Sequence, residues 1–208
     1  MIYILSEIHG VKENAQAIEY VIRKYNIKSI YIEYYTALEK EVRNFIFNNK
    51  PLRSSKFLEL SDDGRMYYEL LVTLRNLAKE GQIKEAYCYA TSKATSSWNE
   101  REEEYYKEFK KRYEKSRLKD CLVIMGKAHA KLFSYKQNVV RYLPFAYKVS
   151  RGYEVEVIEI VYKKGEYYNF GIHQFSRSIN TESKNEMKTY IIEEANSVCI
   201  EDLEKLFA

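Results

Sequence analysis

Four side chains that can carry protons or bind a metal each end or follow one of three short, mainly apolar stretches. They are Glu7 and His9 after residues 2–6, Glu33 near the end of residues 29–34, and His129 after residues 121–125. Short apolar stretches of this kind predict buried strands. Because parallel strands end at one edge of a sheet, where open α/β folds bind ligands, we expect these four side chains to converge there.

The four side chains allow two kinds of chemistry. Carboxylates together with imidazoles suit zinc, manganese or iron, or a general-base pair without a metal. Taken singly, Glu7 fits a helix cap and His9 or His129 fits a turn residue bonded to the backbone. Two of the chain's three histidines nevertheless follow separate strands, which favours a shared site. The predicted metal ligands are Glu7, His9, Glu33 and His129, with zinc or manganese preferred over magnesium because imidazole suits them.

Composition restricts the environment of the chain. Its 208 residues include 34 Lys and Arg against 30 Asp and Glu, a net charge of +4 that does not by itself predict a nucleic-acid partner. The three cysteines lie far apart in the sequence, which fits a reducing compartment and buried thiols. We find no apolar run of membrane-spanning length and no signal peptide, so a cytoplasmic protein without a membrane partner is expected.

Strand patterns alternate with helical ones through about residue 130. Apolar residues recur at helical spacing over residues 13–25, 37–48, 64–81 and 97–117, and residues 83–90 read as a further strand. This alternation predicts an α/β fold with a mainly parallel sheet flanked by helices. Residues 51–63 are expected to be irregular, and Trp98 is expected on a buried stripe of the last helix.

The pattern changes after Pro144. Residues 155–161 read as a strand, 163–165 as a turn and 167–175 as a return strand, which predicts a β-hairpin extension. A short amphipathic segment follows near Leu203. We expect one α/β domain over 1–208, with a core of residues 1–143 and the hairpin and tail in 144–208.

Several other residues are weaker candidates. Arg101 suits the binding of an anionic substrate group or an oxyanion, although a solvated position on a charged helix is the alternative. Arg65, after an Asp-Asp-Gly turn, could also face the site, although a surface or capping role is preferred. His173 is expected to belong to the hairpin. Three tyrosines near strand ends are candidates for lining the site: Tyr34, Tyr35 and Tyr89.

The order of these motifs resembles a superfamily of known proteins. Ser6-Glu7-Ile8-His9-Gly10, Glu33 and the segment 125–130 (Met-Gly-Lys-Ala-His-Ala) are similar to the G-E-x-H, E and G-x-x-H pattern of Tiki-type proteases, TraB proteins, ChaN-like proteins and erythromycin esterases. The resemblance covers residues 1–130. It also implies an Arg followed by an acidic residue, a place that Arg101-Glu102 fills. Ser6 departs from the pattern, which has Gly there.

The resemblance implies a hydrolase of ester or peptide bonds, acting on a small-molecule or peptide substrate. Glu7, His9, Glu33 and His129 would hold a divalent metal, or would hold and deprotonate a water without one. The alternative is a catalytically silent binding module of the same fold that binds haem, a peptide or a nucleic acid. Nucleic acid is the least expected of these ligands.

Overall fold

A six-stranded parallel sheet forms the centre of the computed structural model, which describes residues 1–137, 139–178 and 188–207. The strands lie in the order β10-β7-β1-β4-β2-β3, and each neighbouring pair is parallel. Their bounds are β1 Ile2–Glu7, β2 Ser29–Tyr35, β3 Glu85–Ala90, β4 Cys121–Gly126, β7 Val155–Tyr162 and β10 Lys188–Ile192. The predicted α/β fold with a mainly parallel sheet is confirmed.

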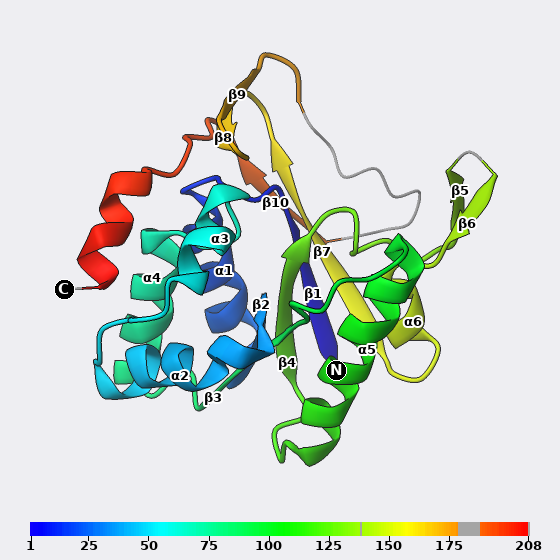
Figure 1. Ribbon diagram of the computed structural model, residues 1–208, viewed down its shortest axis with the longest axis horizontal. Helices are drawn as coiled ribbons and strands as arrows, with labels where there is room; N and C mark the ends of the chain where they lie inside the picture. The colour runs from blue at the N-terminus through cyan, green and yellow to red at the C-terminus, as the bar shows by residue number, and fades with distance from the viewer. Residues whose placement is uncertain (138, 179–187, 208) are drawn as a thin grey trace.

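Helices cover both faces of the sheet (Figure 1). One face shares a hydrophobic core with α1 Asn14–Lys24, α2 Glu39–Asn48, α3 Lys56–Asp62, α4 Tyr68–Lys79 and the 3₁₀ segment η2 Ile200–Leu206, and η2 contacts α4. The other face packs against α5 Trp98–Lys115 and α6 Phe145–Ser150. A 3₁₀ turn, η1 Thr36–Leu38, connects β2 to α2.

The alternation of side chains along each strand divides the core in two. On β4, Leu122 and Ile124 belong to the core under α1–α4, whereas Val123 belongs to the core under α5 and α6. By the same alternation, Glu7 follows Leu5 onto the α1–α4 face, and Glu33 follows Tyr31 onto the α5 face. The two carboxylates therefore leave the sheet on opposite sides.

Two local predictions for the helices are wrong. Residues 56–62, expected to be irregular, form α3, in which Phe57 and Leu60 are buried. Trp98 is 58% exposed, because it is the first residue of α5 and lies outside the buried stripe of Tyr105, Phe109 and Tyr113. Ser97 caps the start of α5, since its side chain accepts a hydrogen bond from the Glu100 amide.

The predicted C-terminal hairpin is present but starts later than expected. It is formed by β8 Gly165–Tyr168 and β9 Ile172–Phe175. The segment 155–161, expected as its first arm, belongs to β7, which lies between β10 and β1 in the main sheet. Apart from Glu156 and Glu159, this strand is apolar towards both faces, as buried parallel strands are. A second hairpin that the sequence did not predict joins β5 Tyr135–Gln137 to β6 Val140–Tyr142.

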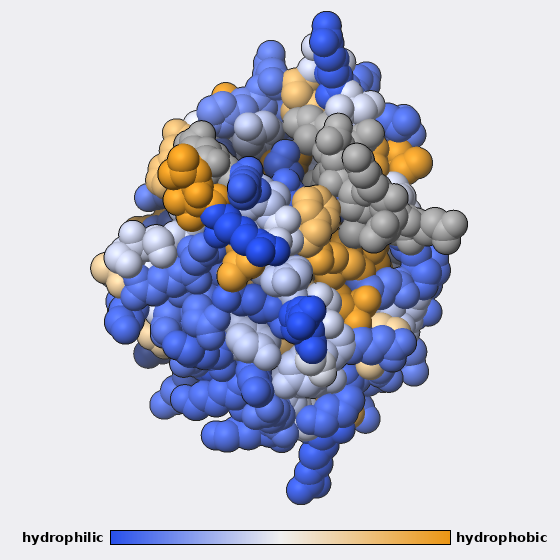
Figure 2. Space-filling model, turned by 90° about the vertical axis from the view of Figure 1, so that its right-hand side faces the viewer, coloured by the Kyte–Doolittle hydropathy of each residue, from blue (hydrophilic) through white to orange (hydrophobic). Residues whose placement is uncertain are grey.

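The surface over α5 and α6 is mainly hydrophilic. Figure 2 views the molecule from this side and shows small apolar patches separated by polar side chains. In the described ranges, no helix combines the length and the apolar character that crossing a bilayer requires.

Candidate functional site

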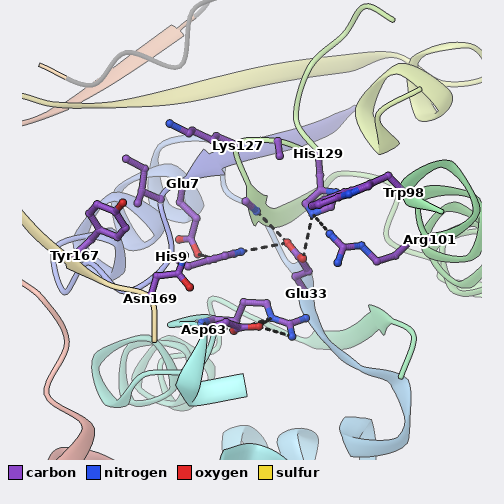
Figure 3. Close-up of a pocket in the computed structure, with 14 residues that line it drawn as sticks. Glu7, His9, Glu33, Asp63, Trp98, Arg101, Lys127, His129, Tyr167 and Asn169 are labelled. Atoms are coloured by element: carbon purple, nitrogen blue, oxygen red, sulfur yellow. Dashed lines mark hydrogen bonds and ion pairs between the residues drawn. The ribbon is translucent and has the colours of Figure 1, made fainter. Parts of the chain in front are cut away.

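A cavity of about 410 Å³ opens at the carboxyl edge of the sheet. Its lining includes all five predicted site residues: Glu7, His9, Glu33, Arg101 and His129. Figure 3 shows Glu33 in the middle, with His9 and Glu7 on one side and His129 and Arg101 on the other. The convergence expected from the strand ends is therefore observed.

His9 lies between Glu7 and Glu33, the two carboxylates that leave the sheet on opposite sides. It lies in the turn after β1, where its Nδ1 is 3.1 Å from Glu7 Oε1 and its Nε2 is 3.6 Å from Glu33 Oε2. Burial lowers the pKa of His9, but the bond to Glu7 and the charges of Glu33 and Glu7 outweigh it, so that the pKa lies above its ordinary value. The imidazolium form of His9 is therefore favoured.

Glycine at position 126 makes room for His9. A Cβ atom at this last residue of β4 would lie 2.8 Å from His9 Nε2. The absence of a side chain lets the imidazole lie against the strand end and reach Glu33.

His129 mirrors His9 on the other side of Glu33. Its Nε2 is 3.6 Å from Glu33 Oε1, and its Nδ1 contacts the carboxylate of Glu102. Glu102 lies on α5, is fully buried, and also accepts hydrogen bonds from the Tyr142 hydroxyl and the Phe145 amide. These contacts fix the carboxylate and, through it, the orientation of the His129 ring.

Glu102 is a site residue that residue patterns alone did not single out. On a helix with many glutamates, only the motif resemblance marked it, as the acidic residue after Arg101. Its complete burial and its contact with His129 distinguish it from the solvated glutamates of α5.

Glu33 is ionised between the two histidines. Burial by itself raises its pKa, but the charges of His129, His9 and Arg65 and the hydrogen bond from the Gly126 amide, 2.9 Å long, lower the pKa to about 2. The carboxylate thus carries a permanent negative charge in the middle of the cavity.

Glu7 has the opposite tendency. Burial raises its pKa, and the bond to His9 offsets this only in part. Its Oε2 is buried and has no hydrogen-bond partner among the described residues. The two glutamates that the sequence treats alike therefore differ in their affinity for a proton.

Arg65 lines the cavity, which agrees with the alternative that it faces the site and not with the preferred surface or capping role. Its guanidinium pairs with Asp63 through hydrogen bonds of 2.9 and 2.8 Å from Nε. The short α3 helix, unexpected from the sequence, ends at Asp62 and brings this pair to the cavity wall. Arg65 therefore contributes positive charge near Glu33 but is already paired with a carboxylate.

The C-terminal hairpin completes the cavity. Tyr167 and Asn169 line it, and the Tyr168 amide donates to the Gly10 carbonyl. Gly10 has a φ of +77°, and a Cβ there would lie 1.9 Å from the Tyr168 carbonyl oxygen. The hydrogen bond between Tyr168 and Gly10 and their close packing hold the hairpin against the turn that carries His9.

The remaining candidates lie elsewhere. Tyr34 and Tyr89 are buried in the two cores and do not line the cavity, whereas Tyr35 lies under the Arg65 guanidinium. His173 is exposed on β9, where its Nε2 is 2.9 Å from the Asn169 carbonyl oxygen. It belongs to the hairpin, as expected.

The four predicted metal ligands all line this cavity. Within the part of the chain that the structure describes, no group of three or more His, Cys, Asp or Glu side chains is arranged to hold a metal ion. Both Nε2 atoms face the Glu33 carboxylate, and both Nδ1 atoms face other carboxylates. Each imidazole nitrogen thus faces a carboxylate oxygen, and zinc or manganese binding stays a prediction.

Comparison with known proteins identifies related folds. No family model matches the chain, and no curated protein matches it. The chain is similar in structure to the type III effector HopBA1, with a TM-score of 0.50 and 10% identity over 76% of each chain. It is also similar to a Bacillus cereus protein, with a TM-score of 0.56 and 10% identity over 89% of this chain and 72% of that one. At this identity the similarity shows the fold alone.

Proposed function

We propose that this protein is a hydrolase of ester or peptide bonds that activates water with its glutamate and histidine side chains. One observation carries the proposal: His9 and His129 direct their Nε2 atoms at the same carboxylate in a cavity, while each Nδ1 contacts a second, buried carboxylate. Carboxylate-oriented imidazoles of this kind serve as general acids and bases. The motif resemblance described above supports the same class of reaction.

His129 is the general base in this proposal. Because an ionised Glu102 only accepts hydrogen bonds, the proton of a neutral His129 lies on Nδ1 and the Nε2 lone pair faces the cavity. Arg101 Nη2, 3.4 Å from Nε2, suits this tautomer because a guanidinium only donates. A water between His129 and Glu33 would give its proton to Nε2 as its oxygen attacks the carbonyl carbon.

His9 is the general acid. The raised pKa of His9 favours the doubly protonated ring, in which Nε2 on the cavity side has a proton to donate. When the bond between the carbonyl carbon and the leaving oxygen or nitrogen breaks, the leaving atom takes this proton. The proton gained by His129 balances the one lost by His9, so return through solvent restores the starting state. Glu33, with a pKa of about 2, stays ionised and stabilises the charge on His9.

The test is hydrolysis of a panel of esters and peptides by the purified chain. His129→Gln should lower kcat about a hundredfold or more, the usual contribution of a positioned base. Glu33→Gln should also lower kcat, because His9 loses the carboxylate that stabilises its charge. Glu19→Gln, which alters an exposed carboxylate on α1, is the matched control and should keep wild-type activity. Circular dichroism of each variant checks that the fold is kept.

Two results would contradict the proposal. One is full activity in His129→Gln. The other is no hydrolysis of any panel member by the wild type, which would favour the binding-module alternative. Elemental analysis of protein purified without chelator tests the zinc or manganese prediction in the same preparation.

A further inference from the structure

We propose that the Arg101 guanidinium binds a carboxylate group of the substrate, beside the bond to be cleaved. This inference rests on the proposed hydrolase function, because only a hydrolase makes the bound carboxylate part of a substrate. Binding of a carboxylate can nevertheless be tested without turnover. Three features of the cavity support it: the unpaired donors of Arg101, the stacking of Arg101 on Trp98 and the pairing of most other charges.

Most hydrogen-bond donors of Arg101 have no acceptor among the described residues. Its Nε is buried without a hydrogen-bond partner, and its polar contact among the described residues is the 3.4 Å approach of Nη2 to His129 Nε2. A guanidinium has five N–H donors and cannot be neutralised. A buried donor without an acceptor is costly, so the cavity is short of an acceptor at this position.

Trp98 holds the guanidinium from one side. The centre of the Arg101 guanidinium lies 4.2 Å from the Trp98 ring centroid. Stacking uses the flat face of the guanidinium and leaves its N–H edge free for a planar, two-oxygen acceptor. Trp98, the chain's single tryptophan, is 58% exposed, although tryptophan side chains are mostly buried in proteins. Its exposure leaves room for a ligand beside it.

Apart from Lys127, the other charged side chains on the cavity wall are already paired. Asp63 pairs with Arg65, and Glu7 and Glu33 contact the histidines. Within the described residues, Arg101 forms no ion pair with any Asp or Glu. Figure 3 shows Arg101 beside His129 and Glu33, whereas Lys127, the other unpaired cation of the lining, extends away from them.

A carboxylate fits this site better than a phosphate. The three acidic side chains of the lining would repel a doubly charged group more strongly than a singly charged one. The flat guanidinium edge also matches the two oxygens of a carboxylate. Because Arg101 lies so close to the Nε2 of His129, the carboxylate would lie within a few bonds of the carbonyl that is attacked. Half-esters of dicarboxylic acids and acylated amino acids have this arrangement.

The experiment uses benzoate, with benzamide as its neutral analogue and phenylphosphonate as a tetrahedral anion. None of the three needs to be turned over. Each is titrated into the full chain while the indole N–H resonance of Trp98 is followed by NMR, and this resonance needs no assignment because the chain has one tryptophan. We expect saturable binding of benzoate, and at least tenfold weaker binding of benzamide and phenylphosphonate.

Substitutions identify the binding group. Arg101→Gln should weaken benzoate binding roughly 10- to 100-fold, the range for hydrogen bonds to a charged group. Arg101→Lys should give an intermediate affinity, because it keeps the charge but loses the two-donor edge. The matched control is Arg23→Gln on α1, an exposed arginine paired with Glu19 and Glu80, and it should bind benzoate as the wild type does.

Each other outcome overturns the proposal. Equal binding of benzoate and benzamide, unchanged benzoate binding in Arg101→Gln, or no saturable binding of benzoate excludes a carboxylate site. Preference for phenylphosphonate assigns the site to phosphate-type ligands instead. Failure of the hydrolase proposal is a separate result, since carboxylate binding without any hydrolysis would leave Arg101 as a ligand-binding residue of a binding module.

Discussion

At the scale of single residues, the site shows how burial and neighbours give chemically similar side chains different properties. Glu7 and Glu33 are both buried carboxylates at strand ends, yet the pKa of Glu7 is raised and that of Glu33 is lowered to about 2. Glu33 faces two imidazoles, Arg65 and a backbone amide, whereas one oxygen of Glu7 has no partner among the described residues. The acid–base roles follow from these surroundings.

The lowered pKa of Glu33 predicts a pH-dependent stability. A carboxylate whose pKa is lower in the folded state stabilises the fold above its unfolded pKa and loses this contribution as the pH falls. For Glu33 the loss should occur between pH 4.5 and about 2, and a shift of this size corresponds to about 3 kcal/mol. The measurement is the free energy of unfolding in urea over a pH series.

Glu33→Gln separates this contribution from those of other acids. The difference in stability between wild type and Glu33→Gln should shrink as the pH falls through this range, because only the wild type loses the charge. Glu19→Gln should follow the wild type at every pH. Parallel curves for wild type and Glu33→Gln would show that Glu33 has no lowered pKa.

At the scale of elements, strand ends and the turns after them set the geometry. The end of β4 lies beside that of β1, with Gly126 opposite Glu7 in the register. The turn after β1 then folds His9 back over this glycine. The site thus depends on close approach between a side chain and a strand end, and not only on the types of the reacting residues.

Gly126→Ala tests this dependence. The added methyl group would lie 2.8 Å from His9 Nε2, so the imidazole must move. Because a side chain can shift more easily than backbone, stability should change little, but activity should fall about a hundredfold, as displacements of this kind can cause. Hydrolysis rates and thermal unfolding of the purified variant give the two readouts.

Gly152→Ala is the control for this substitution. A Cβ at Gly152 would meet nothing within 4 Å, so both activity and stability should stay near the wild-type values. Full activity in Gly126→Ala would mean that the position of His9 beside β4 is not required for the reaction.

At the scale of the whole molecule, the C-terminal part of the chain supports a site formed mostly by the first 130 residues. The Tyr162 hydroxyl, at the end of β7, accepts a hydrogen bond from the Ile8 amide and donates one to Asn14. Asn14 in turn donates to the Ile8 carbonyl. These bonds fix the turn that carries His9, across more than a hundred residues of sequence.

Tyr162→Phe should therefore affect both stability and activity. It leaves the Ile8 amide and the Asn14 carbonyl oxygen buried without this partner, at a cost of about 1–3 kcal/mol. Activity should fall as the turn loosens around His9. Urea unfolding and hydrolysis rates are the measurements.

Tyr153→Phe provides the comparison, since the Tyr153 hydroxyl makes an exposed contact of 3.4 Å with Glu114. Its loss should change stability by less than about 0.5 kcal/mol. If Tyr162→Phe were as stable and active as Tyr153→Phe, the C-terminal segment would not support the site through this residue.

The sequence by itself determined the class of fold and the location of the site. Helical and strand periodicities alternate strongly enough to predict a parallel sheet, and parallel strands necessarily end at one edge. Glu7, His9, Glu33 and His129 could be placed there from local patterns alone, because each follows or ends a strand.

Tertiary structure decided what local patterns do not encode. The place of β7 beside β1, the entry of Arg65 and Tyr167 into the cavity, and the pairing of Glu102 with His129 are contacts between segments far apart in the sequence. Alternation within each strand then placed Glu7 and Glu33 on opposite faces, with His9 joining them. Their ionisation follows from burial and from these distant charges, which only the folded chain brings together.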